Sequence, residues 1–318
     1  MQKTKSAPQG AVLNARQRAK AIRRREFKRD WPVYLLFLPA VVLFGTFNYA
    51  PMFGIVMAFE NFKPTKGFFG SKWVGMANFM DLFSSEEFFQ VFRNTIVMAF
   101  MNLTIGFIFP LLLALLLSEL TSRKFRRVVQ TVSYMPYFVA TVVVCTLITN
   151  FVDTNGIITD ILVAFGAERE NLLANPKYFW WINTFSEVWQ GMGYGSIVYV
   201  AAIANISPNL YEASAMDGAN RWHRMLHITL PGVLPTVITM FTLRVGLVFV
   251  TGFDKVLLLY SPTIYDTADC LSTYTYRYGI ANGNYGLSAA AGLFQSVIAT
   301  ALLIVSNKLN QFASKKLG

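Results

Sequence analysis

Charged residues are scarce in this sequence. They make up 14% of its 318 residues, whereas soluble globular domains typically carry about 25%. Apolar residues reach 54%, and 28 phenylalanines contribute to that share. So little charge for so much apolar surface argues against a water-soluble enzyme, a disordered tail protein and a nucleic-acid-binding module. A chain of this composition is expected to have lipid as its main solvent.

Cysteines and nucleotide-binding motifs are equally scarce. The two cysteines, Cys145 and Cys270, imply no disulfide framework and match no zinc-ligand spacing. The sequence has no Gly-x-x-x-x-Gly-Lys loop, so it lacks a phosphate-binding loop of its own. His223 and His227 have zinc-like spacing but no glutamate between them, and no nucleophile is placed with a base. We therefore predict no metal site and no catalytic residues.

Six apolar segments are long enough to cross a bilayer, which needs about 20 mostly apolar residues. The predicted spans lie at about 33–57, 94–117, 128–152, 180–205, 232–254 and 287–307. The fourth carries one charge, Glu187, and the fifth carries Arg244. The predicted fold class is an all-α integral membrane protein with six transmembrane helices.

The direction of the spans follows from the basic residues between them. Nineteen lysines and arginines fall in the two termini and in the loops 118–127 and 206–231, against eight in the other loops. Short loops rich in lysine and arginine stay in the cytoplasm. Both termini are therefore expected to be cytoplasmic. This asymmetry explains the net charge of +11 without a nucleic-acid partner.

The sequence predicts two domains, a basic segment at residues 1–30 and a six-span transmembrane domain at residues 31–318. Ten of the basic residues lie in the first segment, interleaved with apolar ones. Such a segment forms either a helix on the anionic inner leaflet or a disordered arm. The charge-free run 31–59 is too long for the apolar region of a secretory signal, so we expect it to be retained as a span.

The loop at residues 207–231 contains the most specific pattern. Pro208 favours a helix start, Gly218 allows a sharp turn, and Pro231 stands where the fifth span begins. The pattern predicts two short helices joined by a turn and projecting into the cytoplasm. The first helix has small alanine and serine residues and an acidic residue, which suits docking into a groove on a partner. The alternative is an ordinary loop between spans.

This stretch resembles the EAA loop of the permeases of ATP-binding-cassette (ABC) importers, which reads Glu-Ala-Ala, three residues, Gly, nine residues, Ile-x-Leu-Pro. The matching residues are Glu212, Ala213, Gly218, Ile228, Leu230 and Pro231, and Ser214 replaces the second alanine. Asp217 before the glycine resembles the carbohydrate branch. Thr273-Tyr274-x-Tyr276-Arg277 and the late Asn307 resemble the LplB-like polysaccharide permeases.

The resemblance implies a type I importer permease with a MetI-like fold, spanning the cytoplasmic (inner) membrane of a prokaryote several times. It implies a second, non-identical permease subunit, two ATPase subunits and an extracytoplasmic solute-binding protein that delivers a sugar. This chain would bind no cofactor, and ATP and Mg would be bound by the ATPase subunits. The residues expected to couple to the ATPase are Glu212, Ala213, Ser214, Asp217, Gly218, Ile228, Leu230 and Pro231.

A candidate substrate path lies in the fourth span. Asn183, Glu187, Gln190 and Tyr194 are spaced by four, three and four residues, which places them on one face of a helix. Trp189 adds an aromatic face on which a sugar ring could stack. Depth arithmetic at 1.5 Å per residue places Arg244 at the same level as Glu187. We expect these two charges to pair or to face one cavity; the alternative is that Arg244 pairs with the partner permease.

Two other interpretations concern smaller features. Gly191, Gly193 and Gly195 favour close helix packing or a hinge. Residues 255–286 form an outer loop, rich in tyrosine at positions 265–278, that either contacts a binding protein or packs locally. At the level of the whole chain, the alternatives to an importer subunit are a stand-alone secondary transporter or channel and an intramembrane enzyme. The first would show repeated halves, and the second would need paired catalytic residues.

Overall fold

The computed structural model of the chain describes residues 9–249 and 252–317. The chain divides into two units, residues 1–56 and residues 57–318. Helices form nearly all of the described secondary structure, together with one pair of two-residue strands. The prediction of an all-α protein is confirmed.

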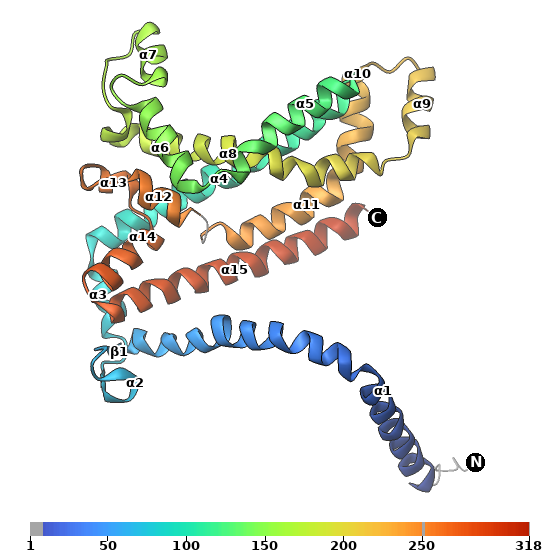
Figure 1. Cartoon of the computed structure of the whole chain (residues 1–318), viewed down its shortest axis with the longest axis vertical. Helices are drawn as coiled ribbons and strands as arrows, with labels where there is room; N and C mark the ends of the chain where they lie inside the picture. Colours follow the sequence, from blue (N-terminus) through green and yellow to red (C-terminus); the bar gives the residue numbers. More distant parts are fainter. Residues whose placement is uncertain (1–8, 250–251, 318) are drawn as a thin grey trace, which may run out of the picture. The chain divides into compact units, whose positions relative to one another are not determined.

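The first unit is one long helical stretch. Helix α1 (Gln9–Phe44) continues through a π-helical turn, η1 (Gly45–Tyr49), into a 3₁₀ segment, η2 (Ala50–Phe59). The basic segment is helical from Gln9 onward, and residues 1–8 lie outside the described residues. Helix α1 bends along its length (Figure 1), and its two internal prolines each remove an amide donor from the helix.

Five helical stretches among the described residues are long and apolar enough to cross a membrane. They are Glu26–Phe59, Glu86–Glu119, Thr141–Ala164, Arg221–Leu247 and Tyr285–Lys308. The corresponding helices of the second unit are α4 (Glu86–Glu119), α6 (Thr141–Val152) with α7 (Ile157–Ala164), α11 (Leu230–Leu247) and α15 (Tyr285–Leu317). Four of the five stretches match predicted spans in position, and Thr141–Ala164 overlaps only the second half of the predicted span 128–152.

The remaining predicted span, the fourth at 180–205, is α8 (Pro176–Ala204), which is long enough to cross a bilayer but less apolar than the others. Helix α8 lies against α4, α11 and α5 (Arg123–Tyr134) and is the helix around which the second unit is organised (Figure 1). Polar side chains are costly on a lipid-facing helix. Cover by neighbouring helices allows α8 to carry them.

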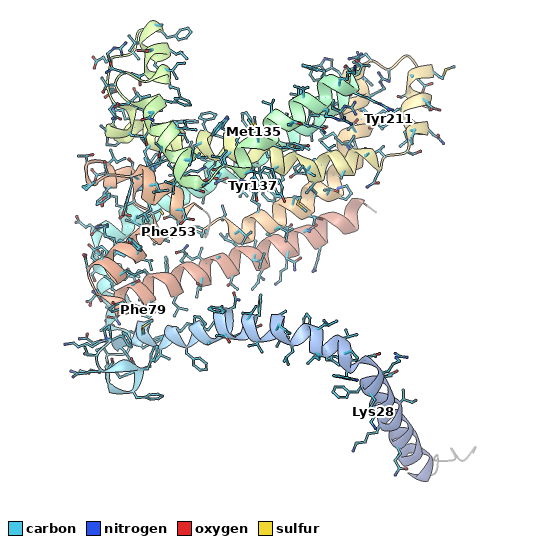
Figure 2. All side chains as sticks on the ribbon, viewed as in Figure 1. Lys28, Phe79, Met135, Tyr137, Tyr211 and Phe253 are labelled. Carbon is cyan, nitrogen blue, oxygen red and sulfur yellow. The ribbon has the colours of Figure 1, made fainter. Side chains whose placement is uncertain are left out.

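The third predicted span, 128–152, is wrong as a single helix. The structure breaks it into α5 and α6, joined by a 3₁₀ turn, η3 (Met135–Phe138), and two residues with extended backbone. Figure 2 shows Met135 and Tyr137 at this break. Pro136 lacks an amide hydrogen, which explains why the helix does not continue through this point. The absence of charge gave no sign of such a break, because no charged residue lies anywhere between residues 128 and 152.

Short elements fill the connections on the side predicted to face outward. Strands β1 (Glu60–Asn61) and β2 (Lys72–Trp73) pair antiparallel, with Glu60 opposite Trp73. The remaining elements are α2 (Gly67–Gly70), α3 (Ala77–Ser84), η4 (Leu172–Ala174), α12 (Phe253–Leu259), η6 (Pro262–Ile264), α13 (Tyr265–Ala268), α14 (Leu271–Tyr276) and η7 (Arg277–Ala281).

The buried core of the second unit is concentrated in these connections and the helix ends beside them. One apolar cluster joins α6 and α8 to α12 and α13, and its fully buried members include Val144, Phe179, Ile264 and Ala268. A second cluster joins α3 and α4 to α14 and α15, and its fully buried members include Leu82, Phe88, Leu271 and Tyr274. Elsewhere the spans expose large apolar side chains such as Leu116. Those surfaces suit contact with lipid or with a partner permease.

Gly193 marks a close approach between two helices. A β-carbon built on Gly193 would lie 1.9 Å from the carbonyl oxygen of Ser133, at the end of α5, and Gly195 is close to Pro110 of α4. Gly191 has no atom within 4 Å of the same position. The predicted packing role therefore holds for Gly193 and Gly195, and small residues at such crossings let backbones approach.

We expect Gly193→Ala to destabilise the protein by about 1–3 kcal/mol, the usual cost of overpacking, because the obstacle is backbone rather than a movable side chain. The measurement is the melting temperature in detergent. Gly191→Ala is the matched control and should leave the melting temperature unchanged or raise it, since alanine favours a helix. Equal melting temperatures for the two variants would contradict the close packing.

Candidate coupling loop and membrane path

The predicted coupling loop forms two helices with a sharp turn between them. Helix α9 (Pro208–Met216) begins with Pro208 in its first turn and ends at Gly218, whose φ of 75° lies in the left-handed region. The Gly218 amide donates to the Ala215 carbonyl at 3.2 Å, and the Ala219 amide donates to the Ser214 carbonyl at 2.9 Å. This pattern satisfies the last carbonyls of α9, as is usual where glycine ends a helix.

The second helix continues without interruption into the fifth span. The Asn220 side chain caps α10 (Arg221–Arg224) by accepting a hydrogen bond from the His223 amide at 2.8 Å. A π-helical turn, η5 (Met225–Thr229), follows, and α11 begins at Leu230. Pro231 lacks the amide hydrogen that a regular helix would use there, which accounts for the widened turn. The loop is thus a rigid extension of the span.

A hydrogen bond holds α9 against this extension. The hydroxyl groups of Tyr211 and Thr229 lie 2.9 Å apart, and Thr229 is buried. Figure 2 shows Tyr211 of α9 on the side that faces α10. A force applied to α9 would therefore reach the start of α11 through a direct contact as well as through the turn. Nothing in the local sequence pattern indicated Tyr211 or Thr229, since 18 residues separate them.

The outer surface of the loop is open. Glu212, Ala213, Asp217 and Gly218 are exposed, and Met216 is 89% exposed. Trp222 on α10 is also largely exposed. Large apolar side chains at this exposure are typical of a docking surface when they are rimmed by charge. His223 and His227 stack at 4.4 Å on the same helical face.

The polar residues of α8 face the break between α5 and α6 and the start of α12. Gln190 donates to the Val139 carbonyl at 3.3 Å, and the Tyr194 ring stacks on Tyr137 at 3.9 Å. Asn183 is buried, with its amide nitrogen 3.8 Å from the Met98 sulfur. Gln190 and Tyr194 therefore contact the segment that joins α5 to α6, whereas Asn183 contacts α4.

The expected ion pair between Glu187 and Arg244 is wrong. Glu187 pairs with Lys255 on α12, at 3.2 Å between the carboxylate oxygen Oε1 and Nζ. Arg244 instead donates to the Asn102 side-chain oxygen on α4 at 2.6 Å. Depth along the helices did not decide the partners, because the rotation of α8, α11 and α4 about their axes determines which side chains meet. Residue 255 lies beside Glu187 because α11 ends at Leu247 and α12 packs against the bundle.

Lys255 is the least expected member of this group. Its side chain is 3% exposed, although the sequence placed it among the loop charges. The Glu187 carboxylate lies off the hydrogen-bonding direction, so the ammonium has no acceptor within the described part of the chain. A buried charge is costly unless it is paired and hydrogen-bonded. Lys255 therefore has hydrogen-bonding capacity that a ligand could use.

Two cavities share Glu187 as a lining residue. A pocket of about 480 Å³ is lined by Tyr137, Gln190, Glu187 and Lys255, and a small cavity of about 30 Å³ is lined by Asn102, Asn183 and Glu187. Arg244 donates a hydrogen bond to Asn102, which lines the small cavity, and the Tyr194 ring stacks on Tyr137, which lines the larger pocket. Five of the six predicted path residues, all except Trp189, therefore line one of these two cavities or contact a residue that lines one.

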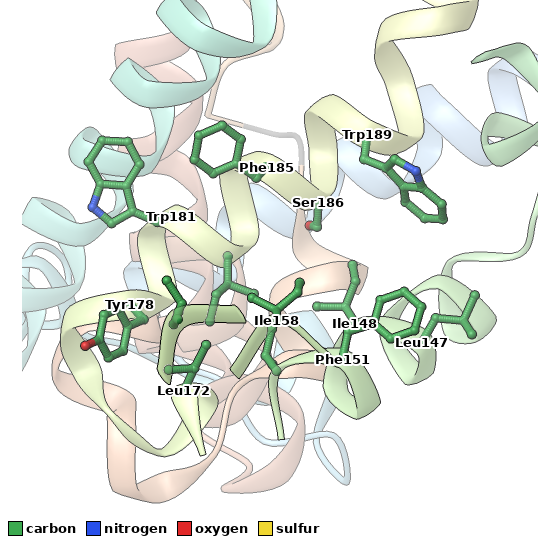
Figure 3. Close-up of a pocket in the computed structure, with 13 residues that line it drawn as sticks. Leu147, Ile148, Phe151, Ile158, Leu172, Tyr178, Trp181, Phe185, Ser186 and Trp189 are labelled. Carbon is green, nitrogen blue, oxygen red and sulfur yellow. The ribbon is translucent and has the colours of Figure 1, made fainter. Parts of the chain in front are cut away.

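Trp189 lies apart from them. With Trp181 and Phe185 it lines an apolar pocket of about 500 Å³ closed on the other side by Leu147 and Phe151 of α6 (Figure 3). A spacing of four residues places these three aromatic side chains on one face of α8, away from Asn183 and Glu187. Apart from the hydroxyl groups of Ser186 and Tyr178, the lining is aliphatic or aromatic. This pocket therefore suits lipid chains or apolar side chains of a partner.

We expect Glu187→Gln to destabilise the protein by about 3–5 kcal/mol, because it leaves the buried Lys255 ammonium unpaired. Lys255→Gln should cost less, because the Glu187 side chain is 29% exposed and its charge remains partly solvated. The double variant should regain most of that stability. Melting temperature in detergent measures this, and the exposed Asp160–Arg169 pair, 2.7 Å apart, is the matched control whose removal should have little effect. Additive losses in the double variant would contradict the pairing.

The tyrosine-rich outer loop packs locally through a charge network. Arg277 pairs with Asp269 and, at 2.6 Å, with Glu87 of α4, and the Tyr278 hydroxyl donates to Glu87. Thr273 donates to Asp269 at 2.6 Å. Tyr274 is buried, and burial raises its pKa to about 12. The loop residues that resembled polysaccharide permeases thus join α14 to the first turn of α4.

The geometry of a projecting helix pair fused to a span can be compared with known proteins. The family described as "Binding-protein-dependent transport system inner membrane component" matches residues 106–315, about two thirds of the chain. The chain belongs to this family. The matched region contains α8, the coupling loop and the Glu187–Lys255 pair.

Individual relatives agree over nearly the whole length of this permease. It is 36% identical over 309 residues to the polygalacturonan/rhamnogalacturonan transport system permease protein YteP of Bacillus subtilis, covering 97% of this chain and 95% of the relative. It is 38% identical over 281 residues to the protein LplB of the same organism, covering 88% of each. The sequence-based assignment to the carbohydrate branch is confirmed by these relatives.

Solved structures show the same fold. A bacterial ABC transporter that imports the acidic polysaccharide alginate matches with a TM-score of 0.83 and 38% identity, covering 90% of the permease and 97% of that chain. The alginate transporter in complex with an alginate pentasaccharide-bound periplasmic protein matches with a TM-score of 0.84 and 37% identity, covering 92% and 98%. The predicted MetI-like importer fold and the inner-membrane location are confirmed for the permease.

Proposed function

We propose that this permease forms half of the membrane channel of an importer for acidic oligosaccharides. It is the permease subunit of a carbohydrate ABC importer, as its family and relatives indicate. The acidic class is supported by the similarity to a transporter involved in the import of the acidic polysaccharide alginate. It is also supported by Lys255, a buried ammonium that pairs with Glu187 but makes no hydrogen bond among the described residues, at a pocket that Tyr137, Gln190 and Asp254 also line. A uronate carboxylate would supply the acceptor, and the tyrosine face and the amide would contact the ring and its hydroxyl groups.

The partners follow from the same assignment. A second, non-identical permease subunit would complete the channel, and two ATPase subunits would bind the coupling loops from the cytoplasm. An extracytoplasmic binding protein would deliver the sugar, as a periplasmic protein does in the related alginate complex. Both termini would then be cytoplasmic. ATP and Mg would be held by the ATPase subunits, because this sequence contains no phosphate-binding loop.

The proposed mechanism uses the loop as a lever. Closure of the ATPase pair would move α9, and the Tyr211–Thr229 contact together with the continuous α10–α11 helix would carry that movement into the fifth span. The spans would then shift between two packed arrangements that open the cavity to one side at a time. Glu212 and Asp217 are exposed where charged contacts with the ATPase would fix its register.

The experiment is uptake by the assembled importer in liposomes. Labelled oligogalacturonate should enter only when the binding protein is outside and ATP is inside, and a neutral oligosaccharide of equal length should enter much more slowly. Uptake without ATP would instead favour a stand-alone transporter. Equal uptake of the neutral and acidic sugars would remove the role proposed for Lys255 while leaving the ATP-driven importer intact.

A further inference from the structure

A second polar hollow lies at the opposite end of the bundle from Lys255, beside the coupling loop. It has a volume of about 590 Å³ and lies between the end of α4, the start of α5, the end of α8 and α10. Arg123, Arg126, Arg221 and Arg224 line it, together with one acidic residue, Glu119. None of these arginines forms an ion pair with a carboxylate within residues 9–249 and 252–317.

One of the four arginines is already fixed in place. Arg126 donates from Nη2 to the carbonyl groups of Leu120 at 2.5 Å and Ser118 at 3.3 Å, which holds the loop between α4 and α5. Its Nε atom is buried and has no acceptor in the part of the chain that the structure describes. Four guanidinium groups facing one space repel one another, and a bound anion with several oxygen atoms would relieve that repulsion.

The rest of the lining indicates the kind of anion. Leu117, Val200 and Ile203 contribute apolar surface from the ends of α4 and α8, which are helices of the membrane domain. A free phosphate has no use for such surface, but a phospholipid carries a phosphate joined to hydrocarbon. Basic pockets between membrane helices on the cytoplasmic side are typical sites for anionic lipid head groups.

We propose that this pocket binds the phosphate head group of an anionic phospholipid of the inner leaflet. The head group joins α5 to α10 and so stabilises the position of the coupling loop relative to the second span. This regulation rests on the function and orientation proposed above. Anionic lipid then increases ATP-driven uptake, whereas lipid of zero net charge, such as phosphatidylcholine, leaves the loop less firmly held.

The binding test uses the assembled importer in nanodiscs of phosphatidylcholine with a minor share of phosphatidylglycerol. Native mass spectrometry after release into detergent counts the phosphatidylglycerol molecules that remain bound. The variant Arg123→Gln, Arg224→Gln should bind phosphatidylglycerol about thirtyfold more weakly, since two charges are lost. The control Lys124→Gln, Arg127→Gln removes the same charge from exposed positions of α5 that do not line the pocket, and should retain the lipid.

Two further outcomes decide between sources of the phosphate group. Millimolar inorganic phosphate should not displace the bound lipid, whereas displacement by phosphate alone, or equal lipid retention by both double variants, would overturn the proposal. In liposomes, raising the phosphatidylglycerol fraction should increase uptake by the wild-type importer and by the control, but not by Arg123→Gln, Arg224→Gln. Lipid retention is measured without transport, so a failure of the importer function would not be mistaken for a failure of the lipid site.

Discussion

Replacing Glu212 by lysine is expected to lower ATP-driven uptake at least about tenfold while the protein still inserts into the membrane. Glu212 is exposed on α9 and does not contribute to the buried core, so folding should not depend on it. A reversed charge at a docking surface places like charges together, which costs several kcal/mol. The measurement is uptake together with the amount of ATPase that copurifies. Glu168→Lys, an exposed reversal on the opposite side, should retain both.

The turn at Gly218 tests the same surface without changing charge. Gly218→Val should also uncouple uptake, because a β-branched residue in the left-handed region strains the turn by about 1–2 kcal/mol and tilts α9. Gly218→Asn should keep most of the activity, since asparagine tolerates that region. No atom lies within 4 Å of the added β-carbon, so any difference between the two reports backbone geometry. Undiminished uptake by Gly218→Val and Glu212→Lys together would refute the coupling role.

Replacing Arg277 by glutamine is expected to have the largest effect on stability. Arg277 joins Asp269, whose side chain is 1% exposed, to Glu87. Removing the arginine leaves a buried carboxylate without its counter-charge, at a cost of about 3–5 kcal/mol. For a chain of this length the melting temperature should fall by roughly 4–8 °C. The paired substitution Arg277→Gln, Asp269→Asn should recover much of the loss, and failure to recover would contradict the charge-network explanation.

The pH dependence of that loss has a definite sign. Burial raises the pKa of the Asp269 carboxyl, although Thr273 and Arg277 act to lower it. Without Arg277 one of the two lowering influences is gone, so the folded-state pKa rises further above the unfolded value. Stability of the variant is then highest below the unfolded pKa and is lost as pH rises through the folded one. The difference in melting temperature from wild type should therefore shrink as the pH is lowered toward 4, and a constant difference would argue against it.

The coupling loop could be predicted almost completely from sequence because its determinants are local. Gly218 ends α9, Asn220 caps α10 and Pro231 widens the turn before α11, and each acts on its own neighbours. The contact that braces the loop was not predictable in the same way. Tyr211 and Thr229 meet only because two helices fold against each other, and neither residue is distinctive by type.

The partners of the charges inside the membrane domain could not be predicted from sequence. Sequence identified Glu187 and Arg244 correctly as unusual, because a charge in an apolar run is costly wherever it lies. It assigned them to each other on depth alone. The structure gives Lys255 to Glu187 and Asn102 to Arg244, since rotation of α8, α11 and α4 about their axes decides which side chains meet. Lys255 was counted as a loop residue because the end of α11 was placed seven residues too late.

Sequence by itself determined that the chain is a multi-span membrane protein, where most of its spans lie, and that two short helices joined by a turn precede the fifth span. It also showed that the sequence contains no phosphate-binding loop. These properties depend on apolarity, spacing and backbone preference, which are read over a few neighbouring residues. Only the tertiary structure decided that the third span breaks at Met135–Phe138, that α8 is the covered central helix, and which buried charges pair. Those depend on how helices far apart in the chain pack, and lipid-compatible apolarity specifies no particular neighbour.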